Sequence, residues 1–330
     1  MNNIVVLGID IGGSLTKVGL VYNDGRILDK TIFKTEAEKD FNFFIKKLKA
    51  ETDELISKQI VTIEIIAIGV GAPNANPYSG QIENPPNLKW GKATPIAKEI
   101  QNTFKLPVYI ANDANAAALG ELQYGIGKGL KNFVTLTLGT GLGSGIISDG
   151  KLLIGAHGVA GEIGHVNVDP YGRKCNCGLQ GCLETYASVT GIKRTVFELL
   201  SDMKDNSVLR NYSFSEMTGE HISEAAIKGD KIALNAFEIT GEILGCKMAD
   251  TVAHLDPEAF IIPGGVSKAG DILLKPLKAN MERYLFNAYK GKVNVLISNA
   301  TRSDAVLGPA ALAWMSIAAD KQQLNYTEKL

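Results

Sequence analysis

The chain contains no apolar stretch of the about 18 residues that a membrane-spanning helix requires. It also lacks an excess of either charge, because 34 Lys and Arg residues face 35 Asp and Glu residues. A protein without a positive surplus does not have the electrostatic footprint of nucleic-acid or anionic-membrane binding. We therefore expect neither nucleic acid nor membrane as a partner, and we favour a small molecule.

Cysteine is scarce, with four residues in the chain. The first residues, Met1-Asn2-Asn3 and a short apolar run, lack the basic segment that starts a signal peptide. The small number of cysteines and the lack of a signal-peptide segment predict a reducing, cytoplasmic setting. The length of 330 residues exceeds the roughly 250–300 residues at which a single core stops growing, so we expect two lobes with a ligand-binding cleft.

Hydrophobic patterning predicts an α/β protein in which one plan occurs twice. Apolar, β-branched runs predict two β-meanders, with strands at 4–9, 17–22 and 27–33 and again at 133–138 and 144–147. Further strands are expected at 65–70, 108–110, 259–262 and 293–297, and helices at 39–58, 93–103, 114–122 and 304–319. The Pro-, Asn- and Gly-rich segment 71–90 is expected to be an irregular loop, and the end from Asp320 to be frayed.

Three of the four cysteines, Cys175, Cys177 and Cys182, lie in one glycine-rich turn, and His165 precedes them. Three thiolates and an imidazole form a closed tetrahedral set for Zn²⁺, which leaves no position for an activated water. The alternative, a disulfide, pairs badly across one or two residues. The pattern predicts a structural zinc site that fixes two neighbouring carboxylates, Glu162 and Glu184.

Two glycine-rich turns, Asp10 to Ser14 and Leu138 to Gly145, are each followed by a predicted strand. Glycines let several backbone N–H groups surround an anion, and Ser14, Thr16 and Thr140 would add hydroxyl donors. A Rossmann or Walker motif needs a helix after its glycines, so a dehydrogenase is excluded. The turns predict phosphate binding, although either one alone could be an ordinary hairpin.

Asp113 follows Asn112 where the strand at 108–110 leads into a helix. Open α/β sheets bind ligands at this edge, and a carboxylate there can take a proton from an alcohol that attacks a phosphoryl group. Aspartate is also a good helix N-cap. The local pattern leaves both roles of Asp113 open.

Together these segments resemble the ROK family of sugar kinases and related repressors, which has the two-lobed actin-like ATPase (ribonuclease H-like) fold. The resemblance spans nearly the whole chain and rests on Asp10-Ile-Gly-Gly-Ser14, Asn112-Asp113-Ala-Asn115, Leu138-Gly-Thr-Gly-Leu-Gly-Ser-Gly145, Gly161-Glu162-Ile-Gly-His165, Cys175-x-Cys177-Gly-x-x-Gly-Cys182-Leu-Glu184 and Gly264-Gly265-Val-Ser267. It implies a smaller N-terminal α/β lobe of residues 1–115 plus 311–330. The larger lobe, 116–310, would carry the zinc turn and an adenosine loop.

The resemblance also implies a role for each matching residue. Asp113 would be the base that deprotonates the sugar 6-hydroxyl. His165 would bind the sugar with one ring nitrogen and zinc with the other. The sugar ligands would be Asn87, with Asn84 as the alternative in the same loop, and Asn112, Glu162, His165 and Glu184. The ATP ligands, with Asp10 positioning Mg²⁺, would be Asp10, Gly12, Gly13, Ser14, Thr16, Lys17, Gly139, Thr140, Gly141, Gly264 and Gly265.

Two positions depart from the family's pattern. Ser14 stands where the family commonly has Thr, which preserves the hydroxyl, and Pro263 replaces the first of three usual glycines in the adenosine loop.

The implied activity is ATP-dependent phosphorylation of a hexose at its 6-hydroxyl, with glucose as the expected substrate. The five expected sugar ligands supply enough donors and acceptors for an unmodified hexose. N-acetylmannosamine, N-acetylglucosamine and fructose are alternatives within the family. A sugar-sensing repressor would need a helix-turn-helix ahead of Asp10. Nine residues precede Asp10, which is too few for this motif. An actin-like filament or chaperone ATPase would leave the Cys₃His turn unexplained. The family's habit predicts a homodimer or homotetramer.

Overall fold

The structure is a computed structural model of the chain, and it describes residues 3–85, 88–263, 270–298 and 304–327, with side-chain surroundings as far as Lys321. Backbone packing divides the chain into a first unit, 1–130, 145–161 and 301–330, and a second unit, 131–144 and 162–300. These boundaries differ from the predicted 115 and 311. The helix Asp113–Gln123 and the last helix, which begins at Leu307, both belong to the first unit because they pack on each other.

The first unit is built on a five-stranded sheet in the order β3-β2-β1-β4-β8. Antiparallel pairing joins β1, β2 and β3, whereas β4 and β8 run parallel to β1. The predicted meander and the two later strands are therefore confirmed. The strands are β1 (Asn3–Ile11), β2 (Leu15–Val21), β3 (Ile27–Lys34), β4 (Ile63–Ala72) and β8 (Val108–Asn112).

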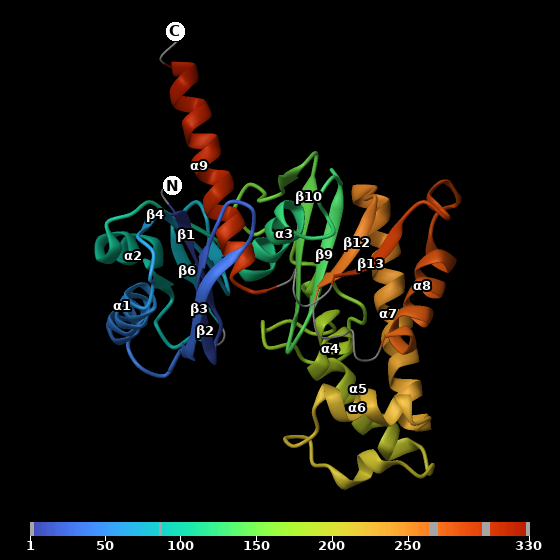
Figure 1. Cartoon of the computed structure of the whole chain (residues 1–330). Coiled ribbons are helices and arrows are strands. Elements are labelled where there is room, and N and C mark those ends of the chain that lie inside the picture. Colours follow the sequence, from blue (N-terminus) through green and yellow to red (C-terminus); the bar gives the residue numbers. More distant parts are fainter. Residues whose placement is uncertain (1–2, 86–87, 264–269, 299–303, 328–330) are drawn as a thin grey trace. The chain divides into compact units, whose positions relative to one another are not determined.

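Helices cover both faces of this sheet (Figure 1). On one face lie α1 (Phe41–Ser57) and α2 (Ile96–Phe104). The N-terminus of α1 is capped by Asp40, which accepts a bond from Phe43 N at 2.9 Å. Phe44 and Leu48, one turn apart, are buried against the alternate β1 residues of that face. This apolar layer fixes the edge from which Asp10 and Asn112 project.

The other face receives α9 (Leu307–Thr327) through glycines of the sheet. A Cβ on Gly69 would lie 1.8 Å from the Pro309 carbonyl oxygen, and a Cβ on Gly8 would lie 2.2 Å from that of Val306. The same helix meets α3 (Asp113–Gln123), where a Cβ on Gly120 would lie 3.1 Å from the Gly308 Cα. Glycine is required because backbone meets backbone at these crossings.

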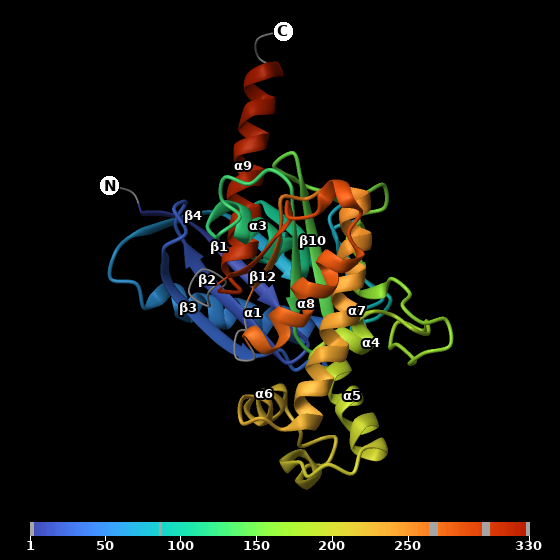
Figure 2. The same cartoon turned by 90° about the vertical axis from the view of Figure 1, so that its right-hand side faces the viewer.

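The second sheet has the order β11-β10-β9-β12-β13, which repeats the chain order of the first. Its strands are β9 (Phe133–Leu138), β10 (Leu142–Ser148), β11 (Lys151–Leu152), β12 (Ala259–Pro263) and β13 (Asn294–Ser298). The helices that follow in the chain are α4 (Glu184–Ala187), α5 (Val189–Asp202), α6 (Gly219–Ile227), α7 (Lys231–Leu255) and α8 (Asp271–Tyr284). The long helices α7 and α8 run side by side (Figures 1 and 2). Short 3₁₀ turns complete the unit at η1 (Ile163–His165), η2 (Val208–Asn211) and η4 (Asn287–Tyr289).

Two predictions about irregular segments are wrong. The segment 71–90 carries most of a small antiparallel sheet, β5 (Ala75–Asn76), β6 (Gln81–Glu83) and β7 (Ala93–Thr94), because its turns bring these short runs together. The last helix does not end near 319 but continues to Thr327. Within the described residues, no helix has both the length and the apolar character needed to cross a membrane.

Candidate active site

The first glycine turn connects β1 to β2 and carries Asp10 near the end of β1. Gly12 N–H donates to the Leu15 carbonyl at 3.0 Å, which closes the turn. Asp10 accepts a bond from Lys17 Nζ at 3.4 Å, and the Ser14 side chain is exposed. The predicted acidic, cationic and hydroxyl groups of this turn thus stand at one edge of the sheet.

The side chain of Thr16 does not join them. It is completely buried, and its hydroxyl lies 2.9 Å from that of Thr35. Thr35 in turn donates to the Gly12 carbonyl at 2.7 Å, so the proton between the two hydroxyls comes from Thr16. The expectation that this hydroxyl binds phosphate is corrected, because it is used to hold the turn. The alternation of β2, which places Thr16 on the core face, is the signal that could have revealed this.

Burial raises the pKa of Asp10 to about 6, and the charge of Lys17 opposes this shift only in part. The carboxylates of Asp113 and Asp304 also raise the pKa of Asp10. Asp304 was not expected at this site. It precedes α9 and pairs with Lys30 of β3 at 2.5 Å. Two carboxylates from distant parts of the sequence therefore act on Asp10, and such a gathering of negative charge favours a divalent cation.

Asn112 and Asp113 lie at the junction of β8 and α3. The N-cap is Asn112, whose side-chain oxygen accepts a bond from Ala114 N at 2.9 Å. Asp113 is the first helical residue, and its Oδ1 accepts from the same N–H at 2.9 Å. The interpretation of Asp113 as only an N-cap is therefore wrong.

Asp113 as a whole residue is exposed, although protein atoms surround its carboxylate closely. Hydration of a charge depends on all the atoms around it, so these protein atoms weaken the hydration of the ionised carboxylate. Burial raises its pKa, against the smaller opposing effect of the Ala114 N–H. A carboxylate with a raised pKa is a stronger base than an ordinary aspartate.

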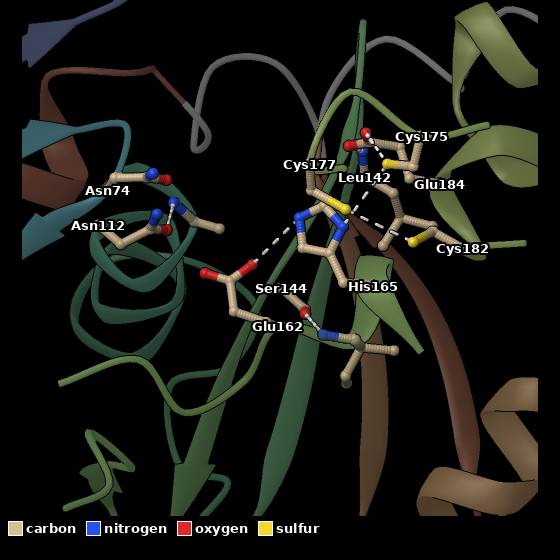
Figure 3. A network of polar contacts seen from close by, with 12 residues as sticks. Asn74, Asn112, Leu142, Ser144, Glu162, His165, Cys175, Cys177, Cys182 and Glu184 are labelled. Carbon is tan, nitrogen blue, oxygen red and sulfur yellow. Dashed lines mark hydrogen bonds and ion pairs between the residues drawn. The ribbon is translucent and has the colours of Figure 1, made fainter. Parts of the chain in front are cut away.

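In the second unit, His165, Cys175, Cys177 and Cys182 converge, with their ligand atoms all within 4.8 Å of one another (Figure 3). Cys177 Sγ lies 3.7 Å from Cys182 Sγ, and Cys175 Sγ lies 3.9 Å from His165 Nδ1. A tetrahedron with Zn–S bonds of about 2.3 Å has edges of about 3.8 Å. The turn can close this tightly because Gly178 and Gly181 have φ of 93° and 76°. The predicted Cys/His cluster therefore exists, and its dimensions fit zinc.

His165 turns its two ring nitrogens to different partners. Nδ1 faces Cys175, whereas Nε2 lies 3.9 Å from Glu162 Oε2 (Figure 3). The turn η1 that carries His165 is held by Ile163 N–H, which donates to the buried Ser144 hydroxyl at 3.1 Å. The two ring nitrogens therefore face different groups, and the predicted binding of zinc by one and of sugar by the other stays a prediction.

Glu184 begins α4, two residues after Cys182. Its Oε2 accepts a bond from Leu142 N–H at 2.9 Å, at the end of the second glycine turn. A Cβ on Gly141 would lie 2.3 Å from this oxygen, which explains the glycine there. Its Oε1 contacts Cys175 Sγ at 3.7 Å. Sequence reasoning did not foresee that one oxygen of this predicted sugar ligand is used by the glycine turn.

The remaining predicted site residues divide into two groups. Gly139, Thr140 and Gly141 lie between β9 and β10 as predicted, with Gly139 and Thr140 exposed. Asn87, Gly264 and Gly265 lie outside the described residues. The alternative to Asn87 is Asn84, an exposed residue with φ of 46° whose carbonyl accepts from Asn74 at 3.1 Å.

The sequence matches the profile of the ROK family over residues 6–315. The chain belongs to the ROK family. A glucokinase of Halalkalibacterium halodurans is 36% identical over 327 residues, which cover 98% of this chain and 97% of that relative. A ROK family glucokinase of Streptomyces griseus, solved with glucose and AMPPNP, has a TM-score of 0.80 and 34% identity and covers 94% of this chain and 99% of its own.

Repressors belong to the same group of relatives. A xylose repressor of Caldicellulosiruptor bescii is 30% identical over 93% of this chain and 77% of the repressor. This member of the ROK family is therefore similar both to enzymes and to regulators.

Proposed function

We propose that this ROK protein is an ATP-dependent hexose kinase that phosphorylates the 6-hydroxyl of glucose. The observation that carries the proposal is the position of Asp113 at the start of α3 together with its raised pKa. Asn112 caps α3, so the Asp113 carboxylate is not needed for that task. Burial of the carboxylate raises its pKa, and the charge of Asp113 in turn raises the pKa of Asp10.

In this proposal the chain's residues divide the work of phosphoryl transfer. Asp113 accepts the proton of the 6-hydroxyl as its oxygen attacks the γ-phosphorus, while Glu162, His165 and Glu184 bind other hydroxyls of the same sugar. Backbone N–H groups of the two glycine turns, together with Ser14 and Lys17, orient the phosphates and neutralise their charge.

Two metals are part of the proposal. Mg²⁺ on the nucleotide neutralises phosphate charge when bound, and Asp10 with its carboxylate neighbours would position it. Zinc would be held by His165, Cys175, Cys177 and Cys182 in a closed, structural set. Burial raises the pKa of the Cys182 thiol to about 12, so metal binding must displace its proton. Zinc would thereby fix His165 and the start of α4 for sugar binding.

The experiment that tests the function is a panel of hexoses and N-acetylhexosamines with MgATP, followed by ADP release and product analysis. We expect glucose to give the highest kcat/KM and the product to be the 6-phosphate. A tenfold preference for N-acetylmannosamine, N-acetylglucosamine or fructose would replace the substrate within the same chemistry. Absence of ADP release with every sugar would refute the kinase proposal and favour the regulator alternative.

We also propose a cytoplasmic setting and a homodimer or homotetramer. The four cysteines are free thiols, which fits a reducing compartment. Light scattering of the purified protein tests the oligomeric state.

A further inference from the structure

The second glycine turn is held from one side by residues 184–190, which we call the supporting segment. Three bonds join the two. Val189 N–H donates to the Gly139 carbonyl at 2.9 Å, the Thr190 hydroxyl donates to the Thr140 carbonyl at 2.9 Å, and Leu142 N–H donates to Glu184 at 2.9 Å. Carbonyls and an amide of one short turn are therefore all tied to the same support.

The direction of these bonds decides where the turn's other groups point. In a planar trans peptide the C=O and the following N–H point in opposite directions. Because the supporting segment donates hydrogen bonds to the carbonyls of Gly139 and Thr140, these carbonyls face it, and the N–H groups of Thr140 and Gly141 point the other way. Within the described part of the chain, neither N–H makes a hydrogen bond. Two adjacent, parallel N–H groups form an anion-binding nest.

The support is itself rigid. Val189 and Thr190 form the first turn of α5, which is capped by the fully buried Ser188 through a bond from Gly191 N–H at 3.0 Å. A Cβ on Gly191 would lie 2.6 Å from the Tyr186 backbone, so α5 is packed closely against α4. The Thr190 hydroxyl therefore has little freedom to leave the Thr140 carbonyl.

From this geometry we propose that Thr190 is a positioning residue for the nucleotide phosphates, acting through the Thr140–Gly141 peptide. The Thr190 hydroxyl keeps the Thr140 carbonyl turned away from the phosphate and the Gly141 N–H turned toward it. Without that bond the peptide can rotate and present a carbonyl oxygen to an anion. The proposal rests on the proposed kinase function, which assigns the second glycine turn to the phosphates of ATP.

The test compares Thr190→Val, which has the same shape without a hydroxyl, with Thr190→Ser, which restores the donor. Thr251→Val is the matched control, because among the residues that the structure describes the Thr251 hydroxyl bonds only within its own helix α7, to Lys247 O at 2.9 Å. Calorimetry with Mg-AMPPNP in the absence of sugar gives the nucleotide Kd. Calorimetry with glucose alone gives the sugar Kd.

We expect Thr190→Val to weaken nucleotide binding about five- to tenfold, which is the effect of one hydrogen bond. The KM for ATP should rise by a similar factor. The glucose Kd should stay unchanged, Thr190→Ser should recover most of the loss, and Thr251→Val should match the wild type. Equal nucleotide Kd values for wild type and Thr190→Val, or an equal loss in both Kd values, would overturn the positioning role and leave the kinase proposal intact. If the wild type itself did not bind Mg-AMPPNP, the proposed function would fail and this role with it.

Discussion

Two neighbouring residues have separate tasks at the start of α3. Asn112 caps the helix, and Asp113 presents a carboxylate. Asn112 has the preferred N-cap side chain and accepts from Ala114 N–H. Asp113 then stands at the first helical position, where the positive end of the helix dipole favours its charge. The crowding that raises its pKa is nevertheless the stronger influence.

We expect Asp113→Asn to lower kcat by about 10²–10⁴-fold, because the amide cannot accept the proton of the sugar hydroxyl. The protein should fold and bind glucose normally, since Asn112 still caps α3. Steady-state kinetics and glucose calorimetry check both expectations. Asn112→Ala serves as the comparison, and should mainly raise the KM for sugar. Near-normal kcat in Asp113→Asn would remove the general-base role.

Asp10 makes a pH dependence of stability predictable. Its pKa is about 6 in the folded protein and near 3.8 when unfolded, because burial outweighs the effect of Lys17. The folded state therefore holds this proton more tightly, and stability is lost as pH rises from about 4 through 6. Two pKa units correspond to at most about 3 kcal/mol.

In Mg²⁺-free, nucleotide-free buffer we expect Asp10→Asn to raise the free energy of unfolding at pH 7.5, with a gain that shrinks toward pH 4.5. Urea unfolding at both pH values measures this difference. The same variant should lose kinase activity, because the neutral amide positions Mg²⁺ poorly. A variant less stable than the wild type at pH 7.5 would contradict the dominance of burial over the Lys17 pair.

Among the elements, α9 shows most directly how small residues govern packing. The first turns of α9 and Val306, which precedes it, lie against Gly8, Gly19 and Gly69 of three adjacent strands, and Gly308 lies against α3. The helix was predicted from its apolar composition, but its length and its docking through glycines were not.

We expect Gly69→Ala to lower the free energy of unfolding by more than about 3 kcal/mol, since its Cβ would lie 1.8 Å from the Pro309 carbonyl oxygen. Gly129→Ala is the control. Its Cβ meets nothing within 4 Å, and only its φ of 96° opposes the substitution, at roughly 1 kcal/mol. Chemical denaturation compares the two variants. Similar losses would show that α9 can shift away from the sheet at little cost.

The turn that carries Cys175, Cys177 and Cys182 is the second element whose role can be tested. We expect one zinc per chain in protein purified without chelator, and loss of the metal in Cys182→Ala together with lower thermal stability and weaker glucose binding. Cys246→Ala is the matched control, since Cys246 in α7 is outside the cluster. Elemental analysis gives the stoichiometry. Zinc-free protein with full glucose affinity would contradict the assignment.

For the whole molecule, the two sheets share one strand order, and each carries a glycine turn between its first two strands in chain order. The sequence predicts this repetition because alternation of apolar residues and glycine-rich turns are local signals. Family membership followed in the same way from the motifs, and the profile match over residues 6–315 confirms it.

The sequence by itself determined which residue types stand at the ends of which strands, and which residues form the Cys/His cluster. These features depend on the spacing of neighbours along the chain. Only the tertiary structure decided which polar groups remain available to ligands. The Thr16 hydroxyl bonds to Thr35, and one Glu184 oxygen accepts from Leu142 N–H. The charge of Asp304, near the end of the chain, acts on Asp10. Such pairings are set by packing between remote segments. The alternation of β2 indicates that Thr16 faces the core, but the local pattern does not identify the partner of any of these groups.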